Sequence, residues 1–334
     1  MTGQKASQPA AASRRRKTAK RLLQVAGAPL IFLFSWYAMG RATSPLRAAR
    51  AFNAADAPAA GRPAMSRLRI GTYNIAHGRG LAESNWVGRD AETTAKRLRA
   101  IARLLSKENL DIVVLNEVDF GCTWTRGVNQ AEFIAREAGL PSRAEGRNLD
   151  VHLPFLAFRF GNAVLSRFPI VAARAVDYPA RSRFEAAVAG QKRGLLCTLD
   201  LGDARRVRVL AVHLEHRDEP VRIATAGVIA GLASDGGPPL IAAGDFNSTP
   251  TDFPHAARTA DGRTALSELL ESGRFATGLQ GPPAEGDLTF SSDRPRALID
   301  WILVPTVWKI DRQRAIDSQL SDHRPVVAEV ELPD

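Results

Sequence analysis

The stretch Pro239-Leu240-Ile241-Ala242-Ala243-Gly244-Asp245-Phe246-Asn247 joins a short apolar run to a glycine, a carboxylate and a carboxamide. A short apolar run bounded by turn residues is typical of a buried strand. Asp245 and Asn247 would then lie at the mouth of that strand, where they could activate a water molecule and hold a phosphate. The simpler alternative is an Asx turn after the strand, which needs no function.

Similar polar residues interrupt or end other apolar runs of the chain. A buried charge at such a place is costly unless it is paired, hydrogen-bonded or bound to a metal. Because several separate segments share this arrangement, one common site explains them better than unrelated caps and turns, although a strand histidine such as His213 is often simply hydrogen-bonded in a core. The residues are Asn74, Glu117, His213, Asp300, Asp322 and His323.

Strand-like runs and helical patterns alternate along the body of the chain. The runs 194–201 and 207–214 are separated by five residues, Gly202 to Arg206, which predicts a hairpin and an antiparallel pair. Other runs are separated by helical patterns, which predicts a mixed sheet. With no internal repeat and no second linker, residues 68–334 are expected to form one α/β domain. The strands are expected at 68–75, 111–118, 163–165, 194–201, 207–214, 240–243, 288–291, 298–304 and 326–332, and the helices at 93–106, 129–138, 219–233 and 264–270.

The positive charge of the chain is confined to its N-terminal segment. The formal net charge is +10, but the first 50 residues hold ten Lys or Arg and no acidic residue, so the remainder has 35 basic and 35 acidic residues. The high isoelectric point therefore gives no argument for nucleic-acid binding by the body.

Residues 1–40 have the pattern of an export signal or a membrane anchor. A basic cluster from Arg14 to Arg21 precedes a mostly apolar run from Leu22 to Met39, and Ala38-Met39-Gly40 could be cleaved. The body would then be membrane-anchored and face the periplasm or exterior, or be secreted after cleavage. Residues 41–67, rich in Ala, Arg and Pro, are expected to form a flexible linker. The alternative is a buried hairpin of a soluble protein.

Read in order, these segments resemble the endonuclease/exonuclease/phosphatase superfamily, which includes deoxyribonuclease, apurinic endonucleases, inositol polyphosphate 5-phosphatases and neutral sphingomyelinases. The resemblance covers Arg69 to Val330 and includes Gly161-Asn162-Ala163-Val164-Leu165-Ser166-Arg167. It implies a four-layer α/β/β/α sandwich, two mixed β-sheets flanked by helices, with the active site at one rim of the sheets.

The resemblance also implies a role for each candidate residue. Glu117 would be the principal Mg²⁺ ligand, aided by Asn74 and Asp322, and Mn²⁺ could substitute for Mg²⁺. Asp245 would orient or deprotonate the attacking water, and His323 would stabilise the phosphorus centre or protonate the leaving group. The other implied catalytic residues are His213, Asn247 and Asp300, and the implied phosphate contacts are Asn74, Arg193 and Asn162.

The expected function is therefore Mg²⁺-dependent hydrolysis of a phosphate ester, with a phosphodiesterase or nuclease acting outside the cytoplasm favoured. The stretch from Asn74 to Gly80, which includes His77 and Arg79, resembles exported members related to glycolipid-anchor remodelling. A lipid-directed phosphoesterase is thus an alternative, and a non-catalytic binding module is a weaker one. The partners implied are the phosphoester substrate and a membrane, and no protein. Zinc, serine-hydrolase and nucleotide-loop spacings are absent from the sequence, and the sequence leaves open whether Cys122 and Cys197 pair.

Overall fold

The computed structural model describes residues 27–40, 42, 48–54, 65–87, 90–182, 191–279 and 281–333. The predicted basic cluster and much of the predicted linker lie outside these residues. Residues 50–53 of that linker form a short strand, β1, which pairs with β4. The described residues divide into two compact units, one drawn from 1–44 and 151–156 and the other from the rest of the chain.

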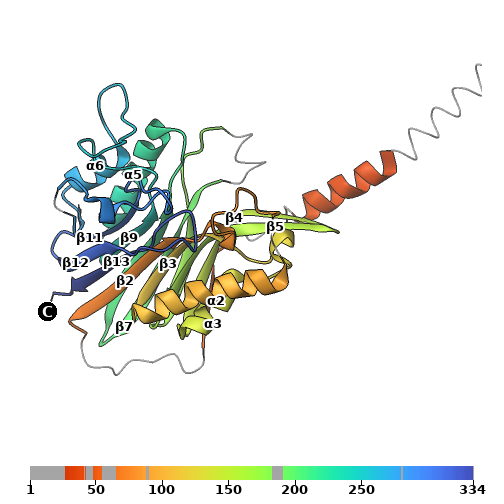
Figure 1. Cartoon of the computed structure of the whole chain (residues 1–334), viewed down its shortest axis with the longest axis horizontal. Helices are drawn as coiled ribbons and strands as arrows, with labels where there is room; N and C mark the ends of the chain where they lie inside the picture. Colours follow the sequence, from red (N-terminus) through yellow and green to blue (C-terminus); the bar gives the residue numbers. More distant parts are fainter. Residues whose placement is uncertain are drawn as a thin grey trace, which may run out of the picture. The chain divides into compact units, whose positions relative to one another are not determined.

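Two β-sheets form the larger unit (Figure 1). Each sheet contains one parallel pair, β2 with β3 and β8 with β9, among antiparallel neighbours, so both sheets are mixed as expected. The seven-stranded sheet has the order β1 (Arg50–Asn53), β4 (Ser142–Leu153), β5 (Leu156–Ser166), β3 (Ile112–Asp119), β2 (Arg67–Asn74), β13 (Val326–Glu331), β12 (Lys309–Ala315). The six-stranded sheet has the order β10 (Phe275–Ala276), β11 (Asp300–Pro305), β9 (Leu240–Asp245), β8 (Arg205–His213), β7 (Arg193–Gly202), β6 (Ile170–Asp177).

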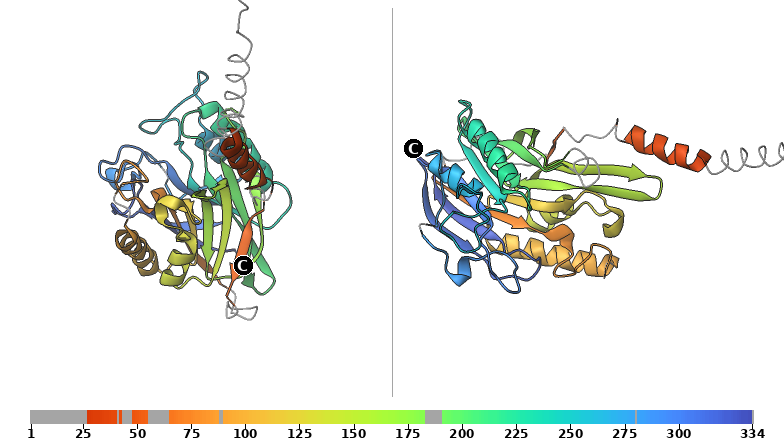
Figure 2. Two further views of the ribbon diagram at one scale, coloured as in Figure 1. Left: turned by 90° about the vertical axis from the view of Figure 1, so that its right-hand side faces the viewer. Right: turned by 90° about the horizontal axis from the view of Figure 1, so that it is seen from above.

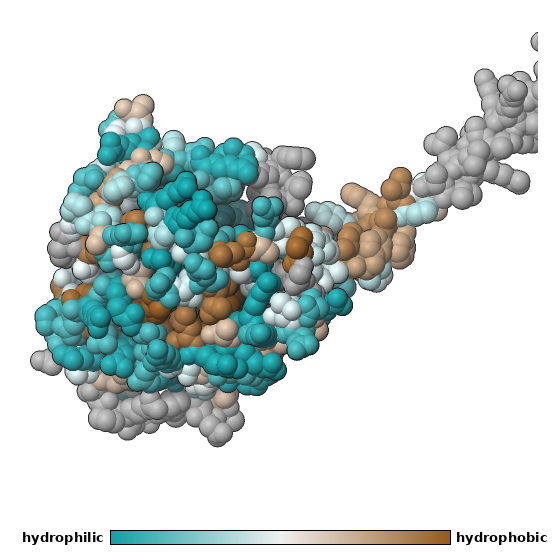
Figure 3. Space-filling model, viewed as in Figure 1, coloured by the Kyte–Doolittle hydropathy of each residue, from teal (hydrophilic) through white to brown (hydrophobic). Residues whose placement is uncertain are grey.

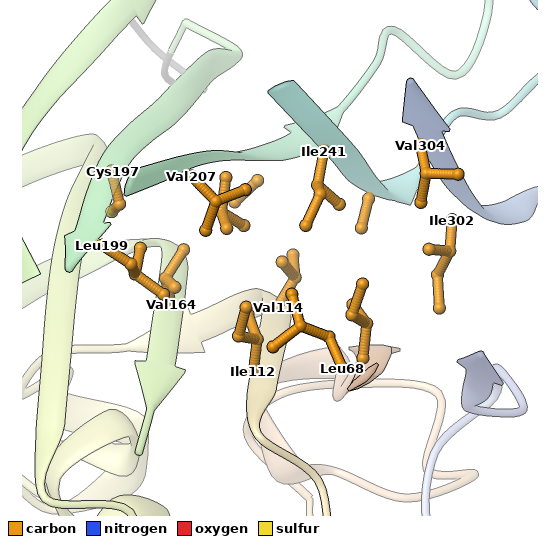
Figure 4. Packing of buried hydrophobic residues seen from close by; sticks show 14 of the residues in the cluster. Leu68, Ile112, Val114, Val164, Cys197, Leu199, Val207, Ile241, Ile302 and Val304 are labelled. Atoms are coloured by element: carbon orange, nitrogen blue, oxygen red, sulfur yellow. The ribbon is translucent and has the colours of Figure 1, made fainter. Parts of the chain in front are cut away.

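The inner faces of the two sheets pack against each other (Figure 4). Ile112 and Val164 of one sheet belong to the same buried cluster as Val207, Ile241 and Ile302 of the other. Full burial of each such side chain contributes about 2 kcal/mol to folding. Cys197 lies in this cluster and Cys122 is buried elsewhere, and both are free thiols, so the pairing left open by the sequence does not form.

Helices cover the outer faces of both sheets, which completes the four layers predicted from the sequence. Helices α2 (Ala91–Lys107) and α3 (Gln130–Ala138) lie on the seven-stranded sheet, and α5 (Glu219–Ala233) and α6 (Ala265–Glu271) lie on the six-stranded sheet. Figure 2 shows α2 and α5 on opposite sides of the two sheets. Each of the four helices begins at an Asp, Asn or Thr whose side chain accepts a backbone N–H of the first turn.

The expected hairpin between β7 and β8 is present, with a two-residue turn. Asp203 and Ala204 both have positive φ angles, 49° and 60°, which suits the right-handed twist of the flanking strands. The prediction of a strand at 288–291 is wrong, because this segment is a loop in which Phe290 makes only isolated bridges. The strands that were not expected from the sequence are β1, β4, β6, β10 and β12.

The smaller unit contains a helix over residues 27–40. Leu30, Ile31 and Phe34 of this helix are exposed, and Figure 3 shows its surface largely in the hydrophobic colours. The Trp36 ring contacts the ring of His152, with centroids 6.3 Å apart. Within the described residues, no helix is both long enough and apolar enough to cross a membrane.

Candidate active site

Strand register places three predicted residues in one row. Asp245 ends β9, and its neighbour in the parallel strand β8 is His213. Its neighbour in the antiparallel strand β11 is Asp300. Residues paired in register on adjacent strands lie about 5 Å apart. The sheet geometry alone therefore brings together residues that are separated by up to 87 positions in the sequence.

The second sheet contributes Asn74 and Glu117 to the same place. Asn74 ends β2 and pairs with the residue before Glu117 on the parallel strand β3. Its amide nitrogen donates to Asp245 Oδ2 at 3.1 Å and, at 3.4 Å, to Glu117 Oε1. Glu117 lies at a β-bulge with φ of 52°, a left-handed conformation that is uncommon outside glycine. The bulge turns this carboxylate toward the cavity, which it lines.

Asn116 joins the two sheets beneath the site. Its amide nitrogen donates to Asn162 Oδ1 and to the carbonyl of Val212, both at 2.9 Å, and its oxygen accepts the backbone N–H of Asp245 at 3.0 Å. The side chain is fully buried. The side-chain amide nitrogen and oxygen of Asn116 therefore both hold strands that carry the site.

His323 and Asp300 form a buried pair. His323 Nδ1 lies 2.9 Å from Asp300 Oδ2, and Nε2 lies 3.9 Å from Asp245 Oδ2. Burial alone would lower the pKa of His323, but the negative charges of Asp300, Asp245 and Asp322 raise it to about 10. The imidazole is therefore protonated at neutral pH, with Nδ1–H held by Asp300 and Nε2–H directed toward Asp245.

The pKa of Asp245 is higher than that of an ordinary surface carboxylate. Burial raises its pKa to about 6, against the positive charge of His323, which lowers it. Its Oδ1 accepts the backbone N–H of Asn247 at 2.9 Å, so the Asx turn considered as an alternative is present. This turn does not remove Asn247 from the site, because Asn247 lines the same cavity as Asp245.

Lys192 is a cation of the site that the sequence did not identify. Its Nζ contacts His213 Nε2, and both residues line the cavity. Burial lowers the pKa of Lys192, and burial together with the charge of Lys192 holds the pKa of His213 well below its usual value. Two histidines of the site thus differ in charge at neutral pH, since His323 is protonated and His213 is neutral.

The structure places Arg193 and Asn162 outside the residues that line the cavity. The Arg193 guanidinium donates to Asp177 at 2.7 Å, and the Asn162 amide donates to the Arg193 carbonyl at 2.8 Å. The side chains of Arg193 and Asn162 therefore make hydrogen bonds within the protein and do not line the cavity. Lys192, which directly precedes the first residue of β7, lines the cavity instead.

A second group of ionic contacts surrounds Glu117. Arg79 pairs with Asp322, and its Nη1 lies 3.7 Å from Glu117 Oε2. His77 Nε2 lies 3.5 Å from Glu117, and its Nδ1 lies 2.7 Å from Asp119. Burial would raise the pKa of Glu117, but the basic side chains around it, His77 first and then His213 and Lys192, outweigh burial and hold that pKa below its usual range.

The site surrounds a cavity of about 410 Å³. It is lined by predicted residues that come from several different strands and loops, and its polar lining combines carboxylates with cations. The predicted residues that line it are Glu117, His213, Asp245, Asn247, Asp322 and His323, together with His77. Asn74 and Asp300 lie beneath this lining and contact it through hydrogen bonds.

The sequence of residues 71–323 matches the Endonuclease/Exonuclease/phosphatase family. The chain belongs to this family. The matched segment runs from β2 to His323, so it includes every residue of the site. No curated protein matches the chain by sequence.

Solved structures of several proteins have the same fold. A family protein from Beutenbergia cavernae is 21% identical, with a TM-score of 0.58 over 80% of this chain and 72% of its own. A mannosyl-6-phosphatase of Bacteroides thetaiotaomicron is 15% identical, with a TM-score of 0.53 over 79% and 100%. D. rerio TDP2 complexed with a single-strand DNA product is 13% identical, with a TM-score of 0.54 over 80% and 100%. At these identities the similarity establishes the fold alone.

The carboxylates of this family member suit a cation that needs few protein ligands. Among the described residues, no three His, Cys, Asp or Glu side chains form a preformed metal cage. Mg²⁺ is commonly held by one or two carboxylates and keeps several waters. Arg79 lies between Glu117 and Asp322 and contacts both carboxylates.

Proposed function

We propose that the chain is a Mg²⁺-dependent hydrolase of phosphate esters, and in particular a phosphodiesterase. The observation that carries this proposal is the placement of His323 and Asp245 beside Glu117 in one cavity, with Asp300 bound to His323 beneath it. A base of raised pKa and a protonated acid lie 3.9 Å apart there, with anionic ligands for a metal next to them. Paired groups whose environments push their pKa values apart are typical of acid–base catalysis.

Each residue has a role that follows from its protonation state. Asp245, ionised above about pH 6, accepts a proton from the attacking water. His323 donates Nε2–H to a phosphoryl oxygen or to the leaving group, while Asp300 fixes its ring. Lys192 and Asn247 donate to the phosphoryl oxygens, and this placement of positive charge stabilises the transition state.

Glu117 and Asp322 would hold the metal ion, with Asn74 fixing the orientation of Glu117. The ion, when bound, neutralises the charge of the phosphoryl group. Mn²⁺ would serve in place of Mg²⁺, because both accept carboxylate and water ligands.

Hydrolysis of a diester and a monoester with the same leaving group tests the proposal. We expect the purified chain to cleave bis-p-nitrophenyl phosphate faster than p-nitrophenyl phosphate with Mg²⁺, and to lose activity with EDTA. His323→Ala and Asp245→Asn should each reduce the rate by about 10³-fold or more. Val307→Ala, at an exposed position after β11, is the control. A folded chain that hydrolyses no ester of a broad panel would instead be a binding module.

A lipid-directed phosphoesterase is the second candidate. It is favoured by the exposed apolar side chains of the helix at 27–40, including Leu30, Ile31 and Phe34. Together with the preceding basic cluster, this segment supports our proposal that the body is exported and held at a membrane or secreted. Sphingomyelin vesicles distinguish this candidate, and cell fractionation of the full chain against one lacking residues 1–40 tests the localisation.

A further inference from the structure

A set of aromatic rings extends from the catalytic cavity to the protein surface. We call His77, Trp86, Trp124, Phe158 and Phe160 the aromatic wall. His77 and Phe160 line the cavity, and their rings meet edge to face with centroids 5.1 Å apart. Trp124 lies 5.7 Å from His77 and 4.9 Å from Phe158, and Trp86 lies 5.8 Å from Trp124.

The inner part of the wall is held rigidly by one buried carboxylate. Asp119, which is fully buried, accepts the indole N–H of Trp124 at 2.6 Å and faces His77 Nδ1 at 2.7 Å. The Asp119 backbone N–H in turn donates to Gln130 at 2.9 Å. Because these rings are fixed in the free protein, a ligand that stacks on them does not have to order them.

The outer end of the wall is unusually exposed. Trp86 is 56% exposed, in a segment that also exposes Leu81 and Val87. Folding of the chain does not require a large ring at this position, since more than half of its surface remains in water. An exposed apolar patch that continues into a catalytic cavity is typical of a ligand-binding surface.

We propose that the aromatic wall binds a planar aromatic group, a nucleobase, carried on one arm of the phosphodiester whose phosphorus lies near His323. This inference rests on the proposed function. The exposed ring of Trp86, backed by the fixed ring of Trp124, suits stacking of a flat ligand, which is tolerant of base identity. The equal numbers of acidic and basic residues after position 50 favour a single nucleotide or short ester over a long polyanion.

Two diesters with the same leaving group isolate this contact. Thymidine 5′-(p-nitrophenyl phosphate) carries a base, whereas methyl p-nitrophenyl phosphate does not. We expect Trp86→Ala to raise KM for the thymidine ester about tenfold, since loss of one stacking contact costs about 1–3 kcal/mol. The same variant should change KM for the methyl ester less than twofold. Trp86→Phe should restore most of the loss, and Val307→Ala should affect neither ester.

A binding measurement separates this inference from the hydrolytic function. Equilibrium dialysis with thymidine 5′-monophosphate needs no turnover, and Trp86→Ala should weaken its binding about tenfold while binding of methyl phosphate stays unchanged. Equal effects of Trp86→Ala on both ligands, or no effect on either, would overturn the inference. The inference would also be overturned if Trp86→Ala abolished binding of the chain to phosphatidylcholine vesicles and left its nucleotide binding unchanged. The wall would then contact lipid.

Discussion

The Asp300→Asn variant tests how the site keeps His323 protonated. Asp300 is fully buried, and its Oδ2 lies 2.9 Å from His323 Nδ1. Burial lowers the pKa of His323, and the charge of Asp300 is the first of the effects that raise it to about 10. Asparagine has nearly the same shape but no charge, so the pKa of His323 should return to near the ordinary value of about 6.5.

The size of the effect follows from the fraction of protonated imidazole. With a pKa of about 10, His323 is almost fully protonated at pH 8, whereas with a pKa of about 6.5 it is about 3% protonated. The variant should therefore be about twofold slower at pH 6.5 and about 30-fold slower at pH 8. The alkaline limb of its pH–rate profile should move from about pH 10 to about pH 6.5.

The assay is Mg²⁺-dependent hydrolysis of diphenyl phosphate, whose phenolate leaving group benefits from protonation, with phenol measured by chromatography. Asp119→Asn is the matched control, because it neutralises another buried carboxylate beside a histidine, His77, at 2.7 Å. The control should leave the alkaline limb in place. An unchanged alkaline limb in Asp300→Asn, with the fold intact by circular dichroism, would refute the assigned role of the pair.

Three further outcomes are expected. Because burial raises the pKa of Asp245 to about 6 and the base must be ionised, kcat/KM should fall about tenfold per unit below pH 6, and a rate independent of pH there would exclude Asp245 as the base. Asn116→Leu removes three buried hydrogen bonds, two of which join the sheets, and should lower the free energy of unfolding in urea by about 2–4 kcal/mol; a loss below about 1 kcal/mol would contradict this bridging role. Ala204→Gly should raise that free energy by about 1 kcal/mol, since its φ of 60° strains a residue with a Cβ, and a destabilised variant would show that the turn is not strained.

Strands could be predicted from the sequence where a polar residue interrupts or ends an apolar run. This signal located β2, β3, β8, β9, β11 and β13, which are the strands that carry the site. It failed for β12, whose sequence Lys-Ile-Asp-Arg-Gln-Arg-Ala is largely polar because the strand lies at the edge of its sheet. The opposite error, at 288–291, arose because a short apolar run can fill a loop as well as a strand.

The parts of the site that the sequence missed depend on tertiary geometry. Lys192 precedes the first apolar residue of β7, so nothing in the local pattern shows whether it or Arg193 faces the cavity. Asn116 directly precedes Glu117 in the sequence, and only the folded arrangement of the strands reveals its three partners. A protonated His323 beside a neutral His213 likewise depends on burial and on charges from other strands.

A crystal structure grown with Mn²⁺ and inorganic phosphate tests the central claim, that residues from both sheets form one metal-assisted phosphoesterase site. We predict an anomalous Mn²⁺ peak between the carboxylates of Glu117 and Asp322, and a phosphate in contact with His323 and Lys192. A fully bound Mn²⁺ or phosphate that lies elsewhere, with these side chains uninvolved, would contradict the claim.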